Sequence, residues 1–254
     1  MRLCWLLFCL FWGQWVIAAD DELTLYTEHF PPYSYEVDGQ ARGINVALVQ
    51  RACEIAEVQC RIQFFPWLRS MEQALRDPQG GIFSIVRTQK RAPRFHWIGP
   101  LASSRSYLYR LKRRPEVNPQ TLEQAKKFGI AVAHGDIYQE LLLEQGFIPG
   151  VNLLDFPSKS APIELFLKGR VDLVIGSDIV MPAWLAPHKA NMDQVEVVLE
   201  LSNLGNNFLA LNPKVAPDVR NRLQQALDQM RASGEWQQLI DRNRLAASHQ
   251  RVPN

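Results

Sequence analysis

The sequence predicts an α/β fold in which mainly parallel strands alternate with helices. The first observation is the repeated order of apolar, strand-like runs and amphipathic segments with helical spacing. The second is that this alternation occurs in two successive blocks, near 22–106 and 112–202, with a further segment after them. The third is a pair of polar stretches, 103–115 and 202–207, which are candidate crossovers between the blocks. If both are crossovers, the chain leaves the first block and later returns to it.

In the first block, residues 23–28 alternate as a strand does. Residues 43–57 place apolar side chains at steps of four, four and three from Ile44 to Ile55, which is typical of an amphipathic helix. The other elements expected here are strands at 60–65 and 80–86 and a helix at 70–77 that Ser70 would cap.

The second block repeats the pattern, with strands at 127–133 and 171–177 and helices at 137–146 and 161–169. Late strands are expected at 195–201 and 206–212. Two helices, at 217–233 and 235–243, close the fold; the first has Pro217 in its first turn and Gly234 as its stop signal.

The N-terminus has the layout of a secretory signal, because Arg2 is followed by an apolar run and then by small residues. Cleavage is expected after Ala18 or Ala19. A membrane anchor is the alternative, but Gly13 and Gln14 interrupt the run, and no later segment approaches the ~20 apolar residues that a bilayer span needs. We therefore expect an exported chain.

The stretch from Ser84 to Phe95 contains four cations, Arg87, Lys90, Arg91 and Arg94, and first suggests a basic patch. Removal of the signal leaves 27 basic and 26 acidic residues, so the net charge of the mature chain is about +1. Proteins that bind nucleic acid usually have a strong basic excess. The charge balance therefore argues against a nucleic-acid partner.

Cys53 and Cys60 remain after removal of the signal, as an even pair in an oxidising compartment. The residues between them read as a helix end, a turn and a strand start. A disulfide is favoured over two free thiols or half a metal site, because no His or Cys lies nearby at the spacing of zinc ligands.

Ligands of α/β sheets bind outside the carboxyl ends of strands, where backbone donors and helix N-termini converge. The third strand is followed by Ser84-Ile85-Val86-Arg87-Thr88-x-x-Arg91. With Thr88 as N-cap, Arg91 would lie in the first turn of a helix, where a cation opposes the helix dipole unless an anion compensates. The hypothesis is a bidentate carboxylate clamp made with Ser84; the alternative is a solvent-exposed arginine.

Several motifs occur in one order along the whole mature chain. They are LYTEHFPPYSY, GINVAL, the Cys53–Cys60 spacing, S-x-x-x-T-x-x-R, R-F-x-W-x-x-P, AVAHGD, GRVDLVIGSD and the final SGEW. In this order the chain resembles periplasmic solute-binding proteins of the polar amino acid ABC-transporter family (bacterial extracellular solute-binding protein family 3).

The resemblance implies a type II periplasmic-binding-protein fold, with two lobes joined by two crossover strands that close over a ligand. It divides the chain into a signal at 1–19, lobe 1 at 20–106, lobe 2 at 107–203 and a return to lobe 1 at 204–254. It further implies a monomer that binds an amino acid or related carboxylate for an inner-membrane ABC permease, with no enzymatic activity, cofactor or metal.

Carried over to this sequence, the resemblance implies that Arg91 and Ser84 bind the ligand carboxylate. It also implies that Phe30 packs on the ligand side chain, with Tyr33 and Trp67 nearby. Asp136 and Ile137 match positions that donate N–H groups to the carboxylate. The residues expected around the ligand are Glu28, Phe30, Tyr33, Trp67, Ser84, Val86, Arg87, Arg91, Asp136, Ile137, Ser177 and Asp178.

This sequence departs from the family in three places. The acid that usually pairs with the ligand ammonium aligns with Ser177, with Asp178 one residue later, and Asp136 replaces the usual Thr. Either Asp136 or Asp178 makes the ammonium contact, or the ligand is not a standard α-amino acid. Arg87 is an extra cation that either binds a second anionic group or is solvated; solvation is favoured.

Two other classes of function remain open. One is an exported enzyme on the same fold, similar to cyclohexadienyl dehydratase, for which Glu28, His134 and Asp178 are the available acids or bases. The other is a sensory module that presents its ligand to a membrane receptor. We expect binding without catalysis, because no nucleophile–base spacing is visible and the five histidines are scattered.

Overall fold

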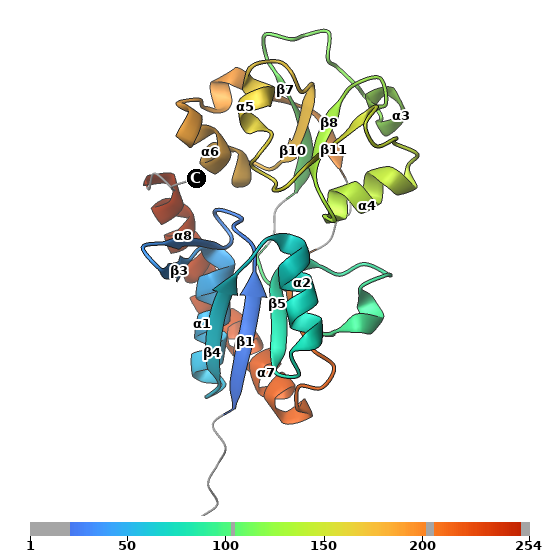
Figure 1. Cartoon of the computed structure of the whole chain (residues 1–254). Coiled ribbons are helices and arrows are strands. Elements are labelled where there is room, and N and C mark those ends of the chain that lie inside the picture. Colours follow the sequence, from blue (N-terminus) through green and yellow to red (C-terminus); the bar gives the residue numbers. More distant parts are fainter. Residues whose placement is uncertain (1–20, 103–104, 202–205, 250–254) are drawn as a thin grey trace, which may run out of the picture.

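The computed structural model describes residues 21–102, 105–201 and 206–249, and these form two lobes, each built on a five-stranded sheet (Figure 1). The strand order is β4-β1-β5-β12-β6 in lobe 1 and β11-β7-β10-β8-β9 in lobe 2. The predicted signal at 1–19 lies outside the described residues.

Lobe 1 combines strands from both ends of the chain. Its strands are β1 (Glu22–Thr27), β4 (Gln59–Phe64), β5 (Gly80–Val86), β6 (His96–Ile98) and β12 (Asn207–Leu211). Strands β4, β1 and β5 are parallel, and β12 runs antiparallel to both of its neighbours because it belongs to the returning chain. The short strands β2 (Tyr35–Val37) and β3 (Gln40–Arg42) form a separate hairpin.

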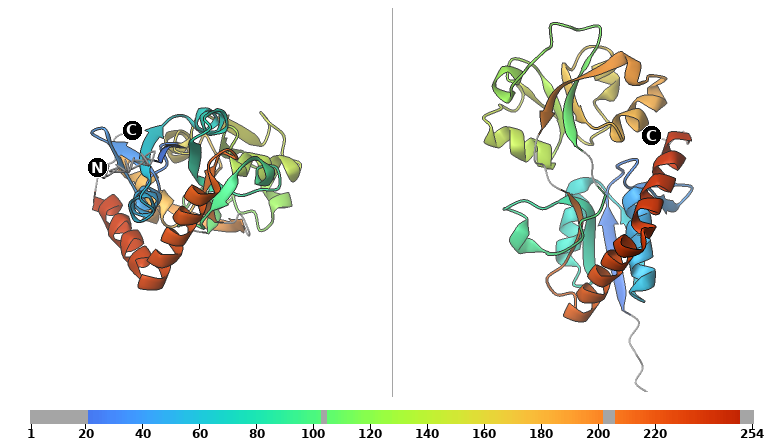
Figure 2. Two further views of the ribbon diagram at one scale, coloured as in Figure 1. Left: turned by 90° about the horizontal axis from the view of Figure 1, so that it is seen from below. Right: turned by 180° about the vertical axis from the view of Figure 1, so that it is seen from behind.

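Helices cover both faces of the lobe 1 sheet. They are α1 (Ile44–Ile55) and α7 (Pro217–Ser233) on one face and α2 (Trp67–Arg76) on the other. Helix α8 (Glu235–His249) packs on α1 and α7, runs along lobe 1 and reaches α6 of lobe 2 (Figure 2).

Lobe 2 has the same layered design. Its strands are β7 (Ser106–Leu111), β8 (Ile130–Ala133), β9 (Leu153–Phe156), β10 (Leu173–Gly176) and β11 (Val195–Leu201), with β8, β9 and β10 parallel. Its helices are α3 (Leu122–Ala125), α4 (Ile137–Glu144), α5 (Ile163–Leu167) and α6 (Val180–Leu185), followed by the 3-10 turns η2 (Ala186–His188) and η3 (Met192–Gln194).

The chain passes between the sheets twice, from β6 to β7 and from β11 to β12. The predicted crossover 103–115 is therefore too long, because 106–111 is the strand β7, paired with β10 and β11 inside lobe 2. Residues 103–104 and 202–205 lie outside the described residues.

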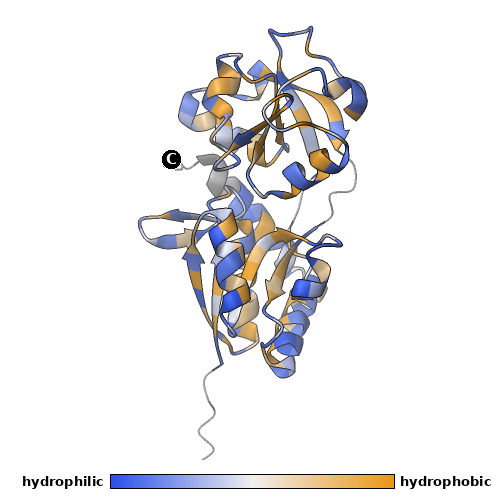
Figure 3. Ribbon diagram, turned by 45° about the vertical axis from the view of Figure 1, so that its right-hand side comes forward, coloured by the Kyte–Doolittle hydropathy of each residue, from blue (hydrophilic) through white to orange (hydrophobic). Residues whose placement is uncertain are grey.

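Apolar residues line the strands and the inner faces of the helices (Figure 3). One hydrophobic cluster fills the α1/α7 side of lobe 1 and the α5/α6 side of lobe 2, and Phe30 and Trp184 meet between the lobes with ring centroids 6.2 Å apart. Separate clusters lie under α2 and under α3 and α4. The inner strands β5, β8 and β10 are buried on both faces, as expected for parallel strands that helices cover on both sides, whereas the outer strands β4 and β11 are partly exposed.

Two local predictions about helix starts were wrong. Helix α2 begins at Trp67 rather than at a Ser70 cap, and the Ser70 hydroxyl instead donates to the carbonyl of Thr27 at 2.8 Å, which ties the helix to the end of β1. After Thr88 the chain forms only the single 3-10 turn η1 (Ala92–Arg94). A helix that began at Thr88 would need an N–H at position 93 for its own backbone bonds, and Pro93 has none.

The predicted disulfide between Cys53 and Cys60 is confirmed. It joins the last turn of α1 to the edge strand β4, with the two Cα atoms 6.2 Å apart. The bond therefore fixes the helix that covers one face of the sheet to the strand at its edge.

Replacement of both cysteines by alanine is expected to lower the free energy of unfolding by roughly 2–3 kcal/mol, since the bond closes a short loop in the unfolded chain. Urea unfolding of the wild type and of Cys53→Ala/Cys60→Ala, each with and without reductant, measures this. Reductant should destabilise only the wild type. If reductant also lowered the free energy of unfolding of the double variant, the effect of reductant on the wild type could not be assigned to this disulfide.

Candidate ligand-binding site

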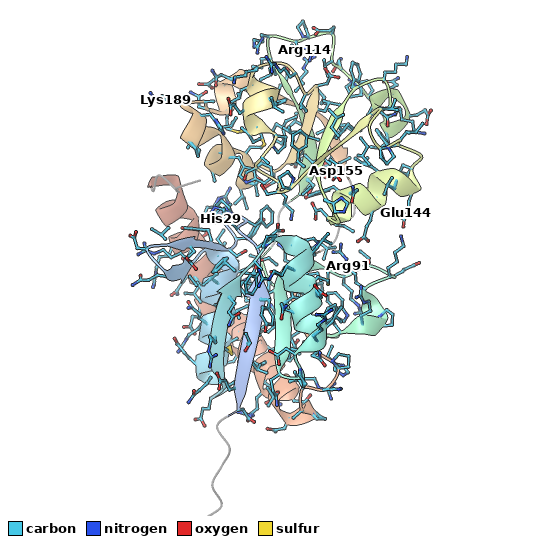
Figure 4. All side chains as sticks on the ribbon, viewed as in Figure 1. His29, Arg91, Arg114, Glu144, Asp155 and Lys189 are labelled. Carbon is cyan, nitrogen blue, oxygen red and sulfur yellow. A yellow bond between two sulfur atoms is a disulfide. The ribbon has the colours of Figure 1, made fainter. Side chains whose placement is uncertain are left out.

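The carboxyl ends of the parallel strands in both lobes face each other. Seven side chains from these ends form contacts between the lobes, and we call them the interlobe site: Glu28, Phe30, Trp67 and Arg91 from lobe 1, and Asp136, Glu140 and Lys159 from lobe 2. Figure 4 shows Arg91 and His29 on the lobe 1 side of this boundary, with Asp155 and Glu144 on the lobe 2 side.

The ammonium of Lys159 lies at the centre of the interlobe site. Its Nζ forms an ion pair with the Glu28 carboxylate and lies 3.5 Å from Asp136 Oδ1. The same atom lies 4.6 Å from the ring centroid of Phe30 and 5.4 Å from that of Trp67, within the range of cation–π attraction. All three charged side chains are at most 9% exposed.

Burial alone would lower the pKa of Lys159, but the carboxylates of Asp136 and Glu28 outweigh burial and raise this pKa above its ordinary value. Burial raises the pKa of Glu28, and the Lys159 ammonium opposes that shift. Lys159 is therefore charged at neutral pH, as a buried cation that has its counter-ions beside it should be.

Arg91 is the second buried cation, with 4% of its side chain exposed. Its Nη2 donates to Glu140 Oε1 at 2.6 Å and to the carbonyl of Gly135 at 3.3 Å, both in lobe 2. The guanidinium carbon lies 5.3 Å from the Trp67 ring centroid, and Trp67 Nε1 donates to the same Gly135 carbonyl at 2.9 Å. Trp67 thus contacts both cations and lobe 2.

Asp136 caps helix α4, because its Oδ1 accepts the Ile137 N–H at 2.7 Å. Its Oδ2 is buried and has no hydrogen-bond partner among the described residues. An unsatisfied buried carboxylate oxygen is costly and calls for a donor. The N–H groups expected to meet a ligand carboxylate are already used, that of Asp136 by Ala133 O and that of Ile137 by the cap.

Ser84 lies at a β-bulge. In the pairing of β5 with β12, Phe208 lies opposite Ile85 and the next residue, Leu209, lies opposite Phe83. Ser84 is therefore the extra residue of the bulge, and its φ of 60° is left-handed. Bulges re-aim side chains near functional sites. Here the hydroxyl accepts from Asn45 Nδ2 at 3.1 Å and lies 3.4 Å from the Ser34 hydroxyl.

The family model for bacterial extracellular solute-binding proteins, family 3, matches residues 23–244. The chain belongs to this family. Both the expected resemblance and the expected two-lobe fold are therefore confirmed.

Several solved structures share the fold of this solute-binding protein. Their sequence identities to it are below 20%, so the similarity shows the fold alone. A histidine kinase sensor domain with similarity to periplasmic binding proteins has a TM-score of 0.77 at 16% identity, covering 87% of this chain and 95% of its own. An arginine-bound amino acid ABC transporter substrate-binding protein from Streptococcus pneumoniae has a TM-score of 0.75 at 16% identity, covering 90% and 97%.

A third structure is an ancestral amino acid-binding protein, a precursor of cyclohexadienyl dehydratase, with a TM-score of 0.71 at 18% identity, covering 87% and 94%. No curated protein sequence matched this chain significantly.

The other residues expected around the ligand are distributed unevenly. Tyr33 is buried behind Phe30, with ring centroids 5.2 Å apart, and Val86 is half-buried in β5. Arg87 is exposed and lies over Trp97 of β6. Ser177 is buried and its hydroxyl accepts the Val180 N–H at the start of α6. Asp178 is exposed and forms a 3.2 Å ion pair with Arg244 of α8.

Sequence reasoning missed Lys159, Glu140 and Tyr138. Lys159 follows β9, a strand that was not expected, so the rule that ligands bind at strand ends was not applied there. Glu140 is an acid in the first turn of α4, where an acidic residue is usually explained by its favourable interaction with the helix dipole.

Tyr138 lies in the first turn of α4. Burial, with the charge of Asp136, raises the pKa of Tyr138 to about 12, and its hydroxyl lies 2.7 Å from the Ser106 hydroxyl.

A cavity of about 440 Å³ opens beside the interlobe site. Lobe 1 contributes His29 and Pro31, and lobe 2 contributes residues on both sides of Lys159, Ser158 and Ser160, together with Trp184 and others. The cavity therefore lies between the lobes, where there is room for a small solute.

Within 21–102, 105–201 and 206–249 no group of three or more His, Cys, Asp or Glu side chains could hold a metal ion. Over the same residues no helix is both long and apolar enough to cross a bilayer.

Gly135→Ala is expected to lower the free energy of unfolding by about 1–2 kcal/mol, because Gly135 has a left-handed φ of +70° that alanine rarely adopts. The added Cβ would also lie 2.4 Å from Leu68 Cδ2, but this atom ends a flexible side chain that is 49% exposed, so Leu68 can turn away. Gly150→Ala is the matched control: its φ of +76° is close to the +70° of Gly135, but its Cβ would meet nothing within 4 Å. Urea unfolding measures both variants, and a much larger loss in Gly135→Ala than in Gly150→Ala would contradict this prediction.

Proposed function

We propose that the protein binds a small solute with both a carboxylate and an amino group, an amino acid or a related compound, and encloses it between the lobes. The observation that carries this proposal is the combination of a buried guanidinium, Arg91, with the unpartnered carboxylate oxygen of Asp136. The Gly135 carbonyl accepts from Arg91, and Asp136 is the next residue, so one small molecule can reach both groups.

Glu140 indicates how Arg91 would hold the carboxylate. Its Oε1 already accepts a charge-assisted hydrogen bond from Arg91 at 2.6 Å, and a ligand carboxylate would take the same position. Glu140 is 26% exposed, so its side chain can turn to solvent when the ligand replaces it. Arg91, which is 4% exposed, cannot do so without unpairing a buried charge.

The missing donor supports Asp136 as the partner of the ligand ammonium. The Oδ2 atom of Asp136 is buried and has no hydrogen-bond partner among the described residues. A ligand ammonium beside this oxygen would supply the donor together with an opposite charge. Asp178, the alternative partner, is exposed and already paired with Arg244, which does not favour it.

Binding without chemical conversion fits the distribution of the three candidate acids and bases. Glu28 belongs to the interlobe site, but His134 is 60% exposed and paired with Asp155, and Asp178 is paired with Arg244. The three groups do not converge on one reacting centre. The competing hypothesis is a cyclohexadienyl dehydratase-like enzyme, and consumption of prephenate or arogenate by the purified protein would favour it.

We further propose that the mature protein is a periplasmic monomer with lobe 1 at 20–106 and 204–254 and lobe 2 at 107–203, and that it delivers its ligand to an inner-membrane ABC permease. Family membership supports a role outside the cytoplasm. The likeness to a histidine kinase sensor domain keeps a sensory role as the second candidate. A pull-down of membrane proteins with the ligand-loaded form would distinguish a permease from a receptor.

Arg91→Ala should weaken ligand binding by about 2–5 kcal/mol, because it removes a desolvated charged contact. Calorimetry with a panel of amino acids and carboxylates, guided by native mass spectrometry of the purified protein, measures the loss. Arg87→Ala is the matched control, since Arg87 follows the same strand but is exposed. Near-wild-type affinity in Arg91→Ala would reject the carboxylate clamp.

Asp136→Asn and Asp178→Asn separate the two candidate partners of the ammonium. Asp136→Asn should weaken binding at least tenfold, because the uncharged amide gives up a charge-assisted hydrogen bond. Asp178→Asn should bind as the wild type does. The reverse order of effects would assign the ammonium to Asp178.

A further inference from the structure

We propose that Lys159 determines specificity by occupying a cation-binding site within the ligand-binding region, so that solutes with cationic side chains are excluded. This inference rests on the proposed amino acid-binding function. We call the groups around the Lys159 ammonium the cation cage: the carboxylates of Glu28 and Asp136 and the rings of Phe30 and Trp67.

The cation cage has the chemistry of a receptor for an organic cation. Two buried carboxylates supply negative charge, and two aromatic rings present electron-rich faces at 4.6 and 5.4 Å from Nζ. Three of its four members come from lobe 1, whereas Lys159 comes from the loop after β9 in lobe 2. The cage is therefore completed by a cation that the protein itself supplies from the opposite lobe.

The cation cage adjoins the interlobe cavity through the chain neighbours of two of the residues that form these contacts. Ser158 and Ser160, on either side of Lys159, line the cavity, as do His29 and Pro31, which flank Phe30. A ligand that places its amino group on Asp136 and its carboxylate on Arg91 lies next to the cation cage. The end of its side chain then meets a fixed ammonium.

A second cation at this position would be unfavourable. It would lie within a few ångströms of the Lys159 ammonium in a region removed from water, where repulsion between like charges is weakly screened. Displacement of Lys159 is also disfavoured, because a tethered group competes at an effective concentration that reaches about millimolar. Neutral or anionic side chains avoid this competition.

Arginine and citrulline provide the test, because they share one shape and differ in a charged guanidinium against a neutral urea. Each would be titrated by calorimetry into the wild type, Lys159→Met and Lys112→Met. Lys159→Met removes the charge and keeps a long apolar chain, whereas Lys112 is an exposed lysine of lobe 2 and serves as the control.

The wild type and Lys112→Met should bind arginine no more tightly than citrulline. In Lys159→Met the ratio of arginine to citrulline affinity should rise about tenfold or more, since the guanidinium gains the Glu28 carboxylate and both ring faces. Lys159→Arg keeps a cation in the cage and should discriminate as the wild type does, which also tests whether the cage tolerates substitution.

Three results would overturn the proposal: tighter binding of arginine than of citrulline by the wild type, an unchanged ratio in Lys159→Met, or no arginine binding by Lys159→Met. They are distinct from failure of the proposed function. If no amino acid or carboxylate of the wider panel binds the wild type, the proposed function fails. If panel members bind through Arg91 while Lys159→Met gains nothing for arginine, only the present inference fails.

Discussion

The functional region depends on one constraint, the orientation of two mixed sheets in which the carboxyl ends of the parallel strands face each other. Parallel strands bring their last residues to one edge of a sheet, and these edges of the two lobes lie opposite each other. Charged residues from distant parts of the chain therefore come into direct contact. Glu28 and Lys159 are 131 residues apart in sequence and form an ion pair across the boundary.

Pairing is what makes such burial tolerable. A carboxylate or an ammonium taken out of water is destabilising unless an opposite charge and hydrogen bonds replace its hydration. In the interlobe site each cation pairs with a carboxylate from the opposite lobe. These pairs form only while the lobes are in contact, and separation of the lobes would expose the charged groups to solvent. The one carboxylate oxygen left without a partner, on Asp136, marks where a solute can contribute what the chain does not.

Sequence patterns predicted the fold class, most regular elements, the disulfide and the placement of Glu28 and Arg91 at strand ends. They failed where the signal is not local. The short strand β9 has no clear alternation, so Lys159 could not be placed, and the Ser84 bulge depends on its register with β12, a strand more than a hundred residues later. Asp178 lies at an expected strand end, but its direction toward Arg244 is set by α8, which no motif relates to it.

Helix α8 gives the molecule a property of practical use. It packs on lobe 1, yet Arg244 near its end pairs with Asp178 of lobe 2. This contact spans the lobe boundary at the periphery, away from the buried charges of the interlobe site, and both partners are exposed. A pair of fluorescent labels placed at these two positions would convert relative movement of the lobes into an optical signal, which would make the protein a scaffold for a reagentless biosensor.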